Sequence, residues 1–147
     1  MRALIFSIAV LLTAGLAADL ALIQPNEVAA KLVGPLDARA QPTPIFFAGP
    51  VVLYRGKHIP GAIEAGPASQ AEGQDLLKKA AAKLDRNLEI VVYCGCCPWD
   101  KCPNIKPAMA LLHEMGFTHA RAMYVETRFA KDWTEKGYPV EAGTPRQ

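Results

Sequence analysis

The stretch that most constrains the fold of this chain is residues 90–104, with the sequence IVVYCGCCPWDKCPN. It begins with an apolar run, rich in β-branched residues, that is typical of a buried strand and ends directly at Cys94. A loop punctuated by glycine and proline follows, and the next helix is expected to begin at Asn104 as its N-cap. A cysteine that ends a buried strand and faces a helix N-terminus lies where backbone N–H groups stabilise a thiolate. The stretch therefore predicts a strand, a loop and a helix around a reactive cysteine.

All four cysteines of the chain, Cys94, Cys96, Cys97 and Cys102, lie in this stretch. Disulfides among them would close only very small loops, so a functional cluster is a stronger hypothesis than a structural framework. For Cys96, Cys97 and Cys102, a resolving or disulfide role is favoured over binding of Cu(I) or Zn(II), because no histidine or carboxylate other than Asp100 stands at ligand spacing. We therefore expect no resident metal and no cofactor, and the metal hypothesis stays open as the weaker alternative.

Strand-like and helix-like segments alternate along the chain. Apolar runs predict strands, and apolar residues at helical spacing predict helices, with Ser69 and Glu72 as a possible capping box. A further apolar run, residues 51–54, follows the first predicted strand. The alternation predicts an α/β fold whose mostly parallel sheet is covered by helices on both faces. The predicted strands are residues 45–48, 89–93 and 121–125, and the predicted helices are residues 25–33, 69–84, 104–115 and 129–136.

Length and charge narrow the class of protein. A chain of 147 residues with 51% hydrophobic residues is long enough for one domain with a well-packed core. The net charge of +2, with no basic run and no basic-aromatic stripe, argues against a nucleic-acid partner.

The N-terminus has the pattern of an export signal. Arg2 precedes an apolar stretch at residues 3–12, and small residues then offer a cleavage site near Ala17 or Ala18. Residues 1–17 are therefore interpreted as a signal peptide, and the mature protein as periplasmic or extracellular, with no stable membrane span after cleavage. The apolar stretch is short for a membrane span, and retention as an uncleaved anchor is the alternative.

Four motifs, in order along the chain, resemble those of the rhodanese family of sulfurtransferases. The resemblance covers residues 24–143, which we predict to form the domain. Four ordered motifs are far more specific than any one of them. They are residues 54–63 (YRGKHIPGAI), with His58 and Gly61, which resemble the family signature Tyr-x-x-Gly-His-Ile-Pro-Gly-Ala; residues 90–94, which resemble the strand before the catalytic cysteine; residues 108–117, which resemble the helix after the active loop; and Trp133 with residues 137–140 (GYPV), which resemble the C-terminal close.

The resemblance implies a fold and an activity. It implies a sheet of about five parallel strands flanked by helices, and transfer of sulfane sulfur through a persulfide on Cys94. The expected partners are small molecules: thiosulfate or a persulfide as the sulfur donor, and a thiol or cyanide-like acceptor. His58 is expected to orient its loop through a backbone hydrogen bond, and Trp133 to lie in the core.

The chain departs from the family in its active loop. The family's loop is usually short, Cys-x-x-Gly-x-Arg, and leads directly into the helix, whereas Cys94 stands well upstream of Asn104. The loop also lacks the arginine, so Lys101 or Lys106 is expected to bind the donor together with backbone groups at Gly95. The family's Asp-x-Arg after its first core strand and its Gly-Gly pair before the last helix are missing as well.

Two other classes of function stay open. The spacing of Cys94 and Cys97 also resembles the Cys-x-x-Cys site of thioredoxin-like thiol–disulfide oxidoreductases, but in that fold the motif precedes most of the sheet, and here only one clear strand follows it. Residues 58–62 have no role in such a plan. The third class is a binding module in which the cysteine cluster carries metal or sulfur for a partner. Sulfur transfer from thiosulfate, disulfide reduction and elemental analysis separate the three.

Overall fold

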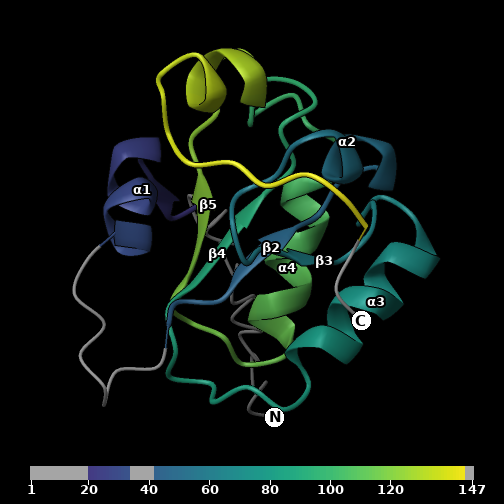
Figure 1. Cartoon of the computed structure of the whole chain (residues 1–147). Helices are drawn as coiled ribbons and strands as arrows, with labels where there is room; N and C mark the ends of the chain where they lie inside the picture. Colours follow the sequence, from purple (N-terminus) through teal and green to yellow (C-terminus); the bar gives the residue numbers. More distant parts are fainter. Residues whose placement is uncertain (1–19, 34–41, 145–147) are drawn as a thin grey trace, which may run out of the picture.

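The predicted α/β class is confirmed by the structure, a computed structural model that describes residues 20–33 and 42–144. Its sheet has five strands in the order β1-β5-β4-β2-β3, and all the pairings are parallel. β4 therefore lies at the centre of the sheet, between β5 and β2 (Figure 1). The strands are β1 (Leu22–Ile23), β2 (Ile45–Phe47), β3 (Ile63–Glu64), β4 (Ile90–Tyr93) and β5 (Ala120–Met123).

Helices cover both faces of the sheet. α1 (Pro25–Val33), α2 (Val51–Gly56) and the short π-helix η1 (Ala130–Thr134) pack on one face, and α3 (Ala71–Ala81) and α4 (Ile105–Glu114) pack on the other. Figure 1 shows α3 and α4 side by side and α1 apart from them. Among the described residues, none of the helices is both long and apolar enough to cross a membrane.

The alternating sides of the strands explain the two cores. Successive side chains of a strand point to opposite faces of the sheet. Phe46 and Val92 therefore contribute to the core beneath α3 and α4, while Phe47, Val91 and Tyr93 contribute to the core beneath α1 and α2. All four residues of β4 are fully buried, as expected for the central strand of a parallel sheet.

The apolar run at residues 51–54 forms a helix, α2, directly after the first core strand. Pro50 stands at its N-cap, where its missing N–H is not needed. Only Tyr54 is buried in this helix, while Val52 and Leu53 remain exposed. The hydrophobicity of this run therefore does not by itself show whether it forms a helix or a strand, because Val52 and Leu53 line a pocket rather than the core.

The predicted capping box at Ser69 and Glu72 is wrong. α3 begins after Gln70, and no side chain caps it. The backbone N–H of Ser69 instead donates to Oδ1 of Asn104, 3.0 Å away. This bond joins the start of α3 to the start of α4 and uses the acceptor that an Asn N-cap would have offered to its own helix.

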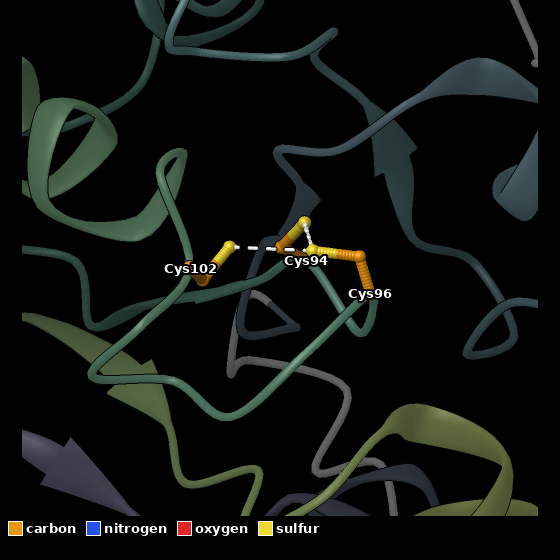
Figure 2. Close-up of side chains that lie close together, drawn as sticks. All are labelled: Cys94, Cys96 and Cys102. Carbon is orange, nitrogen blue, oxygen red and sulfur yellow. Dashed lines mark hydrogen bonds between the residues drawn. The ribbon is translucent and has the colours of Figure 1, made fainter.

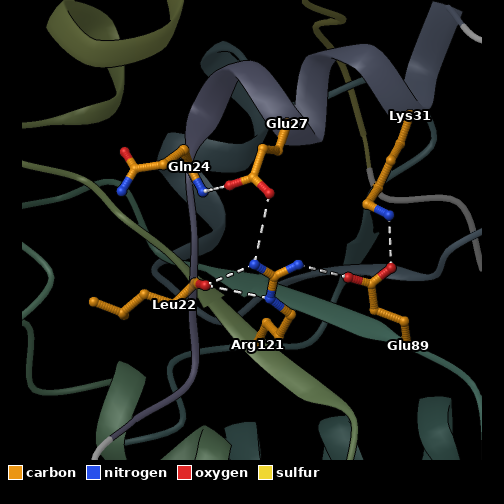
Figure 3. Close-up of polar contacts among 6 residues, drawn as sticks. All are labelled: Leu22, Gln24, Glu27, Lys31, Glu89 and Arg121. Atoms are coloured by element: carbon orange, nitrogen blue, oxygen red, sulfur yellow. Dashed lines mark hydrogen bonds and ion pairs between the residues drawn. The ribbon is translucent and has the colours of Figure 1, made fainter.

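A network of charged side chains connects α1 and β1 to Arg121 on β5 and to Glu89 just before β4 (Figure 3). Arg121 donates to the Leu22 carbonyl from Nε and Nη2, at 3.2 and 2.9 Å, and to Glu89 from Nη1, at 3.1 Å. Lys31 lies 2.6 Å from the other oxygen of Glu89, and Glu27 lies 3.7 Å from Arg121. Burial raises the pKa of Glu89, but the hydrogen bonds from Lys31 and Arg121 outweigh burial and lower it overall.

The expected signal peptide at residues 1–17 lies outside the described residues. The predicted helix at 129–136 is present in shorter form as η1, and the predicted strand at 121–125 is β5, shifted by one residue at its start and ending at Met123.

Candidate active site

The candidate active site lies at the carboxyl edge of the sheet, between β2 and β4. β3, the next strand after β2 in the chain, lies next to β2 in the sheet. β5, the next strand after β4, lies next to β4 on the opposite side, so the order of the strands reverses between β2 and β4. Ligands of open parallel sheets bind at such a reversal, beyond the carboxyl ends of the strands. Cys94 follows β4 directly, and the N–H of Ala48, just after β2, donates to the Tyr93 carbonyl at 2.8 Å.

A cavity of about 580 Å³ opens at this edge. Cys94 lies at its inner wall, and only 1% of the residue is exposed. The cavity wall is mostly apolar, with two cationic side chains at its margin. It is lined by Phe47, Val52, Leu53, Gly56, Lys57, Cys94, Gly95, Cys96, Arg128, Phe129, Ala130 and Thr134.

Three cysteine sulfurs converge beside this cavity, and two of these residues, Cys94 and Cys96, line it (Figure 2). The Sγ atom of Cys96 lies 3.4 Å from that of Cys94 and 3.7 Å from that of Cys102, and all three sulfurs lie within 4.8 Å of one another. Cys94 and Cys102 are buried, whereas Cys96 is exposed. The fourth, Cys97, has its Sγ 2.8 Å from that of Cys96, and all four are free thiols.

Asn104 joins the nucleophile to the helix that follows. It is only 4% exposed and stands just before α4. Its Nδ2 donates to Sγ of Cys94 at 3.4 Å, while its Oδ1 accepts the Ser69 N–H. The sequence predicted that Asn104 caps this helix, but its side chain makes no capping hydrogen bond. It instead places a donor on the sulfur of Cys94.

The thiols of Cys94 and Cys102 are linked by a hydrogen bond that shifts their pKa values in opposite directions. The hydrogen bond with Cys102 and burial raise the pKa of Cys94. The same hydrogen bond lowers the pKa of Cys102 to about 5, helped by the backbone N–H groups of Asn104 and Ile105 and opposed by burial. The sulfur of Cys102, at the start of α4, is therefore placed to accept the proton that leaves Cys94. Burial raises the pKa of Cys97 to about 12.

Two glycines allow the close packing around the nucleophile. A Cβ atom at Gly49 would lie 2.7 Å from Sγ of Cys94, so the chain after β2 approaches the sulfur more closely than any side chain would permit. Gly95 has a φ of +82°, and a Cβ there would lie 2.7 Å from Cβ of Phe129. Its carbonyl accepts the N–H of Phe129 at 3.0 Å, which holds the first turn of the loop against the segment after β5.

Hydrogen bonds of the signature residues around His58 hold the segment between α2 and β3 against β4. Nδ1 of His58 donates to the Tyr54 carbonyl at 2.7 Å, and its Nε2 lies 3.6 Å from a carboxylate oxygen of Glu141. The Tyr93 hydroxyl accepts the N–H of Ile59 at 2.9 Å, which links the signature to β4. Gly61 forms the turn that follows, with a φ of +74°.

Trp133 lies in the core behind the cavity, fully buried, with its indole N–H on the Pro139 carbonyl at 2.8 Å.

The expected cations and the cations found at the cavity differ. Lys101 and Lys106 are exposed and are not among the residues that line the cavity, whereas Lys57 and Arg128 are. Arg128 follows β5, whose carboxyl end meets the same edge of the sheet as that of β4. That parallel arrangement is a sequence signal that would have pointed to Arg128. For Lys57, Gly49 and the bond from Asn104 to Cys94, the sequence offered no such signal.

Comparisons with solved structures show the same fold in other proteins. The structure resembles the Alr3790 protein from Anabaena sp. (TM-score 0.60, 20% identity, 82% of this chain and 92% of that one) and the single-domain sulfurtransferase RDL2 from Saccharomyces cerevisiae (TM-score 0.55, 17% identity, 82% and 94%). It also resembles thiosulfate sulfurtransferase from Pseudomonas aeruginosa (TM-score 0.61, 25% identity), matching 86% of this chain but only 21% of that longer one.

No curated protein matches the chain significantly. The family model of the rhodanese-like domain matches residues 22–133, which include every strand of the sheet, Cys94 and the whole active loop. The chain therefore belongs to the rhodanese-like domain family.

Proposed function

We propose that the protein is a sulfurtransferase that carries sulfane sulfur on Cys94, taking it from thiosulfate or a persulfide and passing it to a thiol or cyanide-like acceptor. The observation that carries the proposal is the place of Cys94 at the inner wall of a cavity, at the carboxyl end of the central strand, with Asn104 donating to its sulfur. The family and its sulfurtransferase neighbours support the same reaction class.

The proposed reaction has two displacements. In the first, the Cys94 thiolate attacks the outer sulfur of thiosulfate, the sulfur–sulfur bond breaks, and sulfite leaves with the electron pair. In the second, the acceptor attacks the outer sulfur of the Cys94 persulfide and the thiolate leaves. The amide of Asn104 stabilises the anionic sulfur in both steps, because hydrogen bonds to charged groups are the stronger ones.

Two cations at the cavity margin are suited to hold an anionic donor. Lys57 lies at the end of α2 and Arg128 after β5, so they approach the cavity from two sides. We expect Arg128→Ala to lower kcat/KM for thiosulfate by up to roughly fivefold, because an exposed charge pair contributes about 0.2–1 kcal/mol. Lys101→Ala and Lys106→Ala serve as matched controls. An effect confined to Lys101→Ala and Lys106→Ala would instead place the donor near the end of the loop and the start of α4, as the sequence predicts.

Intact-mass spectrometry tests the central claim. The reduced protein, treated with thiosulfate, should gain the mass of one sulfur atom on the peptide that contains Cys94, and cyanide should remove it. Cys94→Ser should keep the fold and abolish the gain, because a serine hydroxyl is not ionised at neutral pH. Retention of sulfur transfer by Cys94→Ser would refute the proposal.

Thiol–disulfide exchange is the second candidate, because Cys94 and Cys96 have their sulfurs 3.4 Å apart at the cavity wall. Insulin reduction in the presence of a dithiol measures this activity directly. A protein that reduces insulin but takes no sulfur from thiosulfate would favour the oxidoreductase.

A further inference from the structure

The cysteine cluster has a geometry that sulfur transfer by a single cysteine does not require. Cys96 and Cys102 come from opposite ends of the loop, yet their sulfurs converge with that of Cys94 (Figure 2). Among the described residues, this is the one group of three or more cysteine, histidine or acidic side chains whose ligand atoms lie close enough to share an ion. We propose that Cys94, Cys96 and Cys102 form a three-coordinate thiolate site for a soft monovalent metal ion, Cu(I).

The sulfur–sulfur distances fit one ion. Sulfurs bound at about 2.3 Å to a common metal lie about 4 Å apart in a trigonal arrangement. In the structure, two of the distances are 3.4 and 3.7 Å, and the third pair lies within 4.8 Å. Changes of roughly 0.3–0.8 Å in these separations therefore bring the three sulfurs to bonding positions.

The same distances exclude Cys97 from the site. Its Sγ lies 2.8 Å from that of Cys96, which is too close for two sulfurs that bind the same ion at ordinary angles. Cys97 is therefore a matched control: an adjacent cysteine of the same loop that is not a ligand.

The ligand set favours Cu(I) over Zn(II). Thiolates are soft ligands and select Cu(I), whereas structural Zn(II) takes four ligands in a tetrahedral arrangement. The cluster provides three sulfurs and includes no histidine or carboxylate as a fourth ligand. Two of the sulfurs are buried, and the cavity gives an ion a path to them past the exposed Cys96.

The metal site and sulfur transfer compete for Cys94. A metal bound to its thiolate removes the nucleophile, and a persulfide on Cys94 displaces one ligand. Copper loading should therefore suppress sulfur transfer, and a copper chelator should restore it. This consequence rests on the proposed function, whereas metal binding itself does not.

Anaerobic titration tests the site, with the reduced full-length protein competing for Cu(I) against a chromophoric chelator. We expect one Cu(I) per chain and three sulfur ligands at about 2.3 Å by X-ray absorption. Cys96→Ser and Cys102→Ser should each weaken binding by more than the roughly 10–100-fold that the loss of an outer partner costs. Cys97→Ser should bind as the parent does.

Several results would overturn the site. They are absence of Cu(I) binding, an equal loss in Cys97→Ser, or Zn(II) bound more tightly than Cu(I) with a fourth ligand in the spectrum. Circular dichroism checks that Cys102→Ser is folded, and the exposed Cys96→Ser keeps the test decisive if it is not. Sulfur transfer by the metal-free protein, measured with chelator present, shows separately whether the proposed function holds.

Discussion

Asn104 is the residue whose replacement separates the chemistry of the site from its stability. In Asn104→Ala, Cys94 loses its amide donor and the N–H of Ser69 loses its acceptor. A hydrogen bond to a charged group contributes about 1.5–3 kcal/mol, and sulfur at 3.4 Å is a weak acceptor, so the lower part of that range applies. At about 1.4 kcal/mol per factor of ten, the rate of sulfur transfer should fall roughly tenfold to thirtyfold.

Asn104→Asp is the matched variant. It keeps an oxygen for the Ser69 N–H but removes the donor to Cys94 and adds a negative charge beside the sulfur. Unlike Asn104→Ala, it keeps the Ser69 N–H paired, but it places a carboxylate at a position only 4% exposed, so its stability should fall too. Its rate should fall at least as far as that of Asn104→Ala.

Two measurements decide the question: steady-state sulfur transfer from thiosulfate to cyanide, and alkylation of Cys94 by iodoacetamide with peptide mapping. Urea unfolding gives the stabilities of both variants. If both folded variants transfer sulfur at the parental rate, the contact between Asn104 and Cys94 has no catalytic role, and the proposed positioning of the thiolate is wrong.

Three further outcomes are expected. Gly49→Ala should cost about 1–3 kcal/mol of stability and slow sulfur transfer, because its Cβ would lie 2.7 Å from the Cys94 sulfur. Gly56→Ala, whose Cβ meets nothing within 4 Å, should change stability much less, and urea unfolding and turnover compare the two variants. Glu89→Gln should lower the free energy of unfolding by roughly 1 kcal/mol at pH 7. The difference from the parent should shrink as the pH falls through the lowered pKa of Glu89, because the parent loses the same ion pairs on protonation, and unfolding curves at several pH values measure it. Protein isolated without reductant should be poorly active and regain activity with a mild dithiol. A neighbouring thiolate such as Cys96 can attack the inner sulfur of a Cys94 persulfide, expel sulfide and leave a disulfide, and thiol titration before and after treatment counts the thiols lost and recovered.

The fold could be predicted from the sequence because its strongest signals are local. The run ending at Tyr93 has the composition of a buried central strand, and it is one. β1 and β3 have two residues each, too few for any periodicity to reveal. The apolar run at residues 51–54 did not reveal its helix, because Tyr54 is buried in the core whereas Val52 and Leu53 line a cavity formed with distant parts of the chain.

The site could be predicted only in part. The position of Cys94 after a buried strand follows from sequence order, and so does its approach to the start of α4. The partner of Asn104 does not, because the Ser69 N–H reaches it from a different helix connection, 35 positions away in sequence. The convergence of Cys96 and Cys102 also depends on the path of an irregular loop, and spacing alone does not specify such a path.

Two backbone hydrogen bonds join the active loop to the segment after β5. The Trp99 N–H donates to the Val125 carbonyl at 2.9 Å, and the Phe129 N–H donates to the Gly95 carbonyl at 3.0 Å. Regions that share such bonds open together in native-state hydrogen exchange. Trp99 and Phe129 amides should therefore exchange with the same opening free energy, below that of β4. The nucleophile's surroundings and Arg128 then form one cooperative unit that mild denaturant releases while the sheet is still intact.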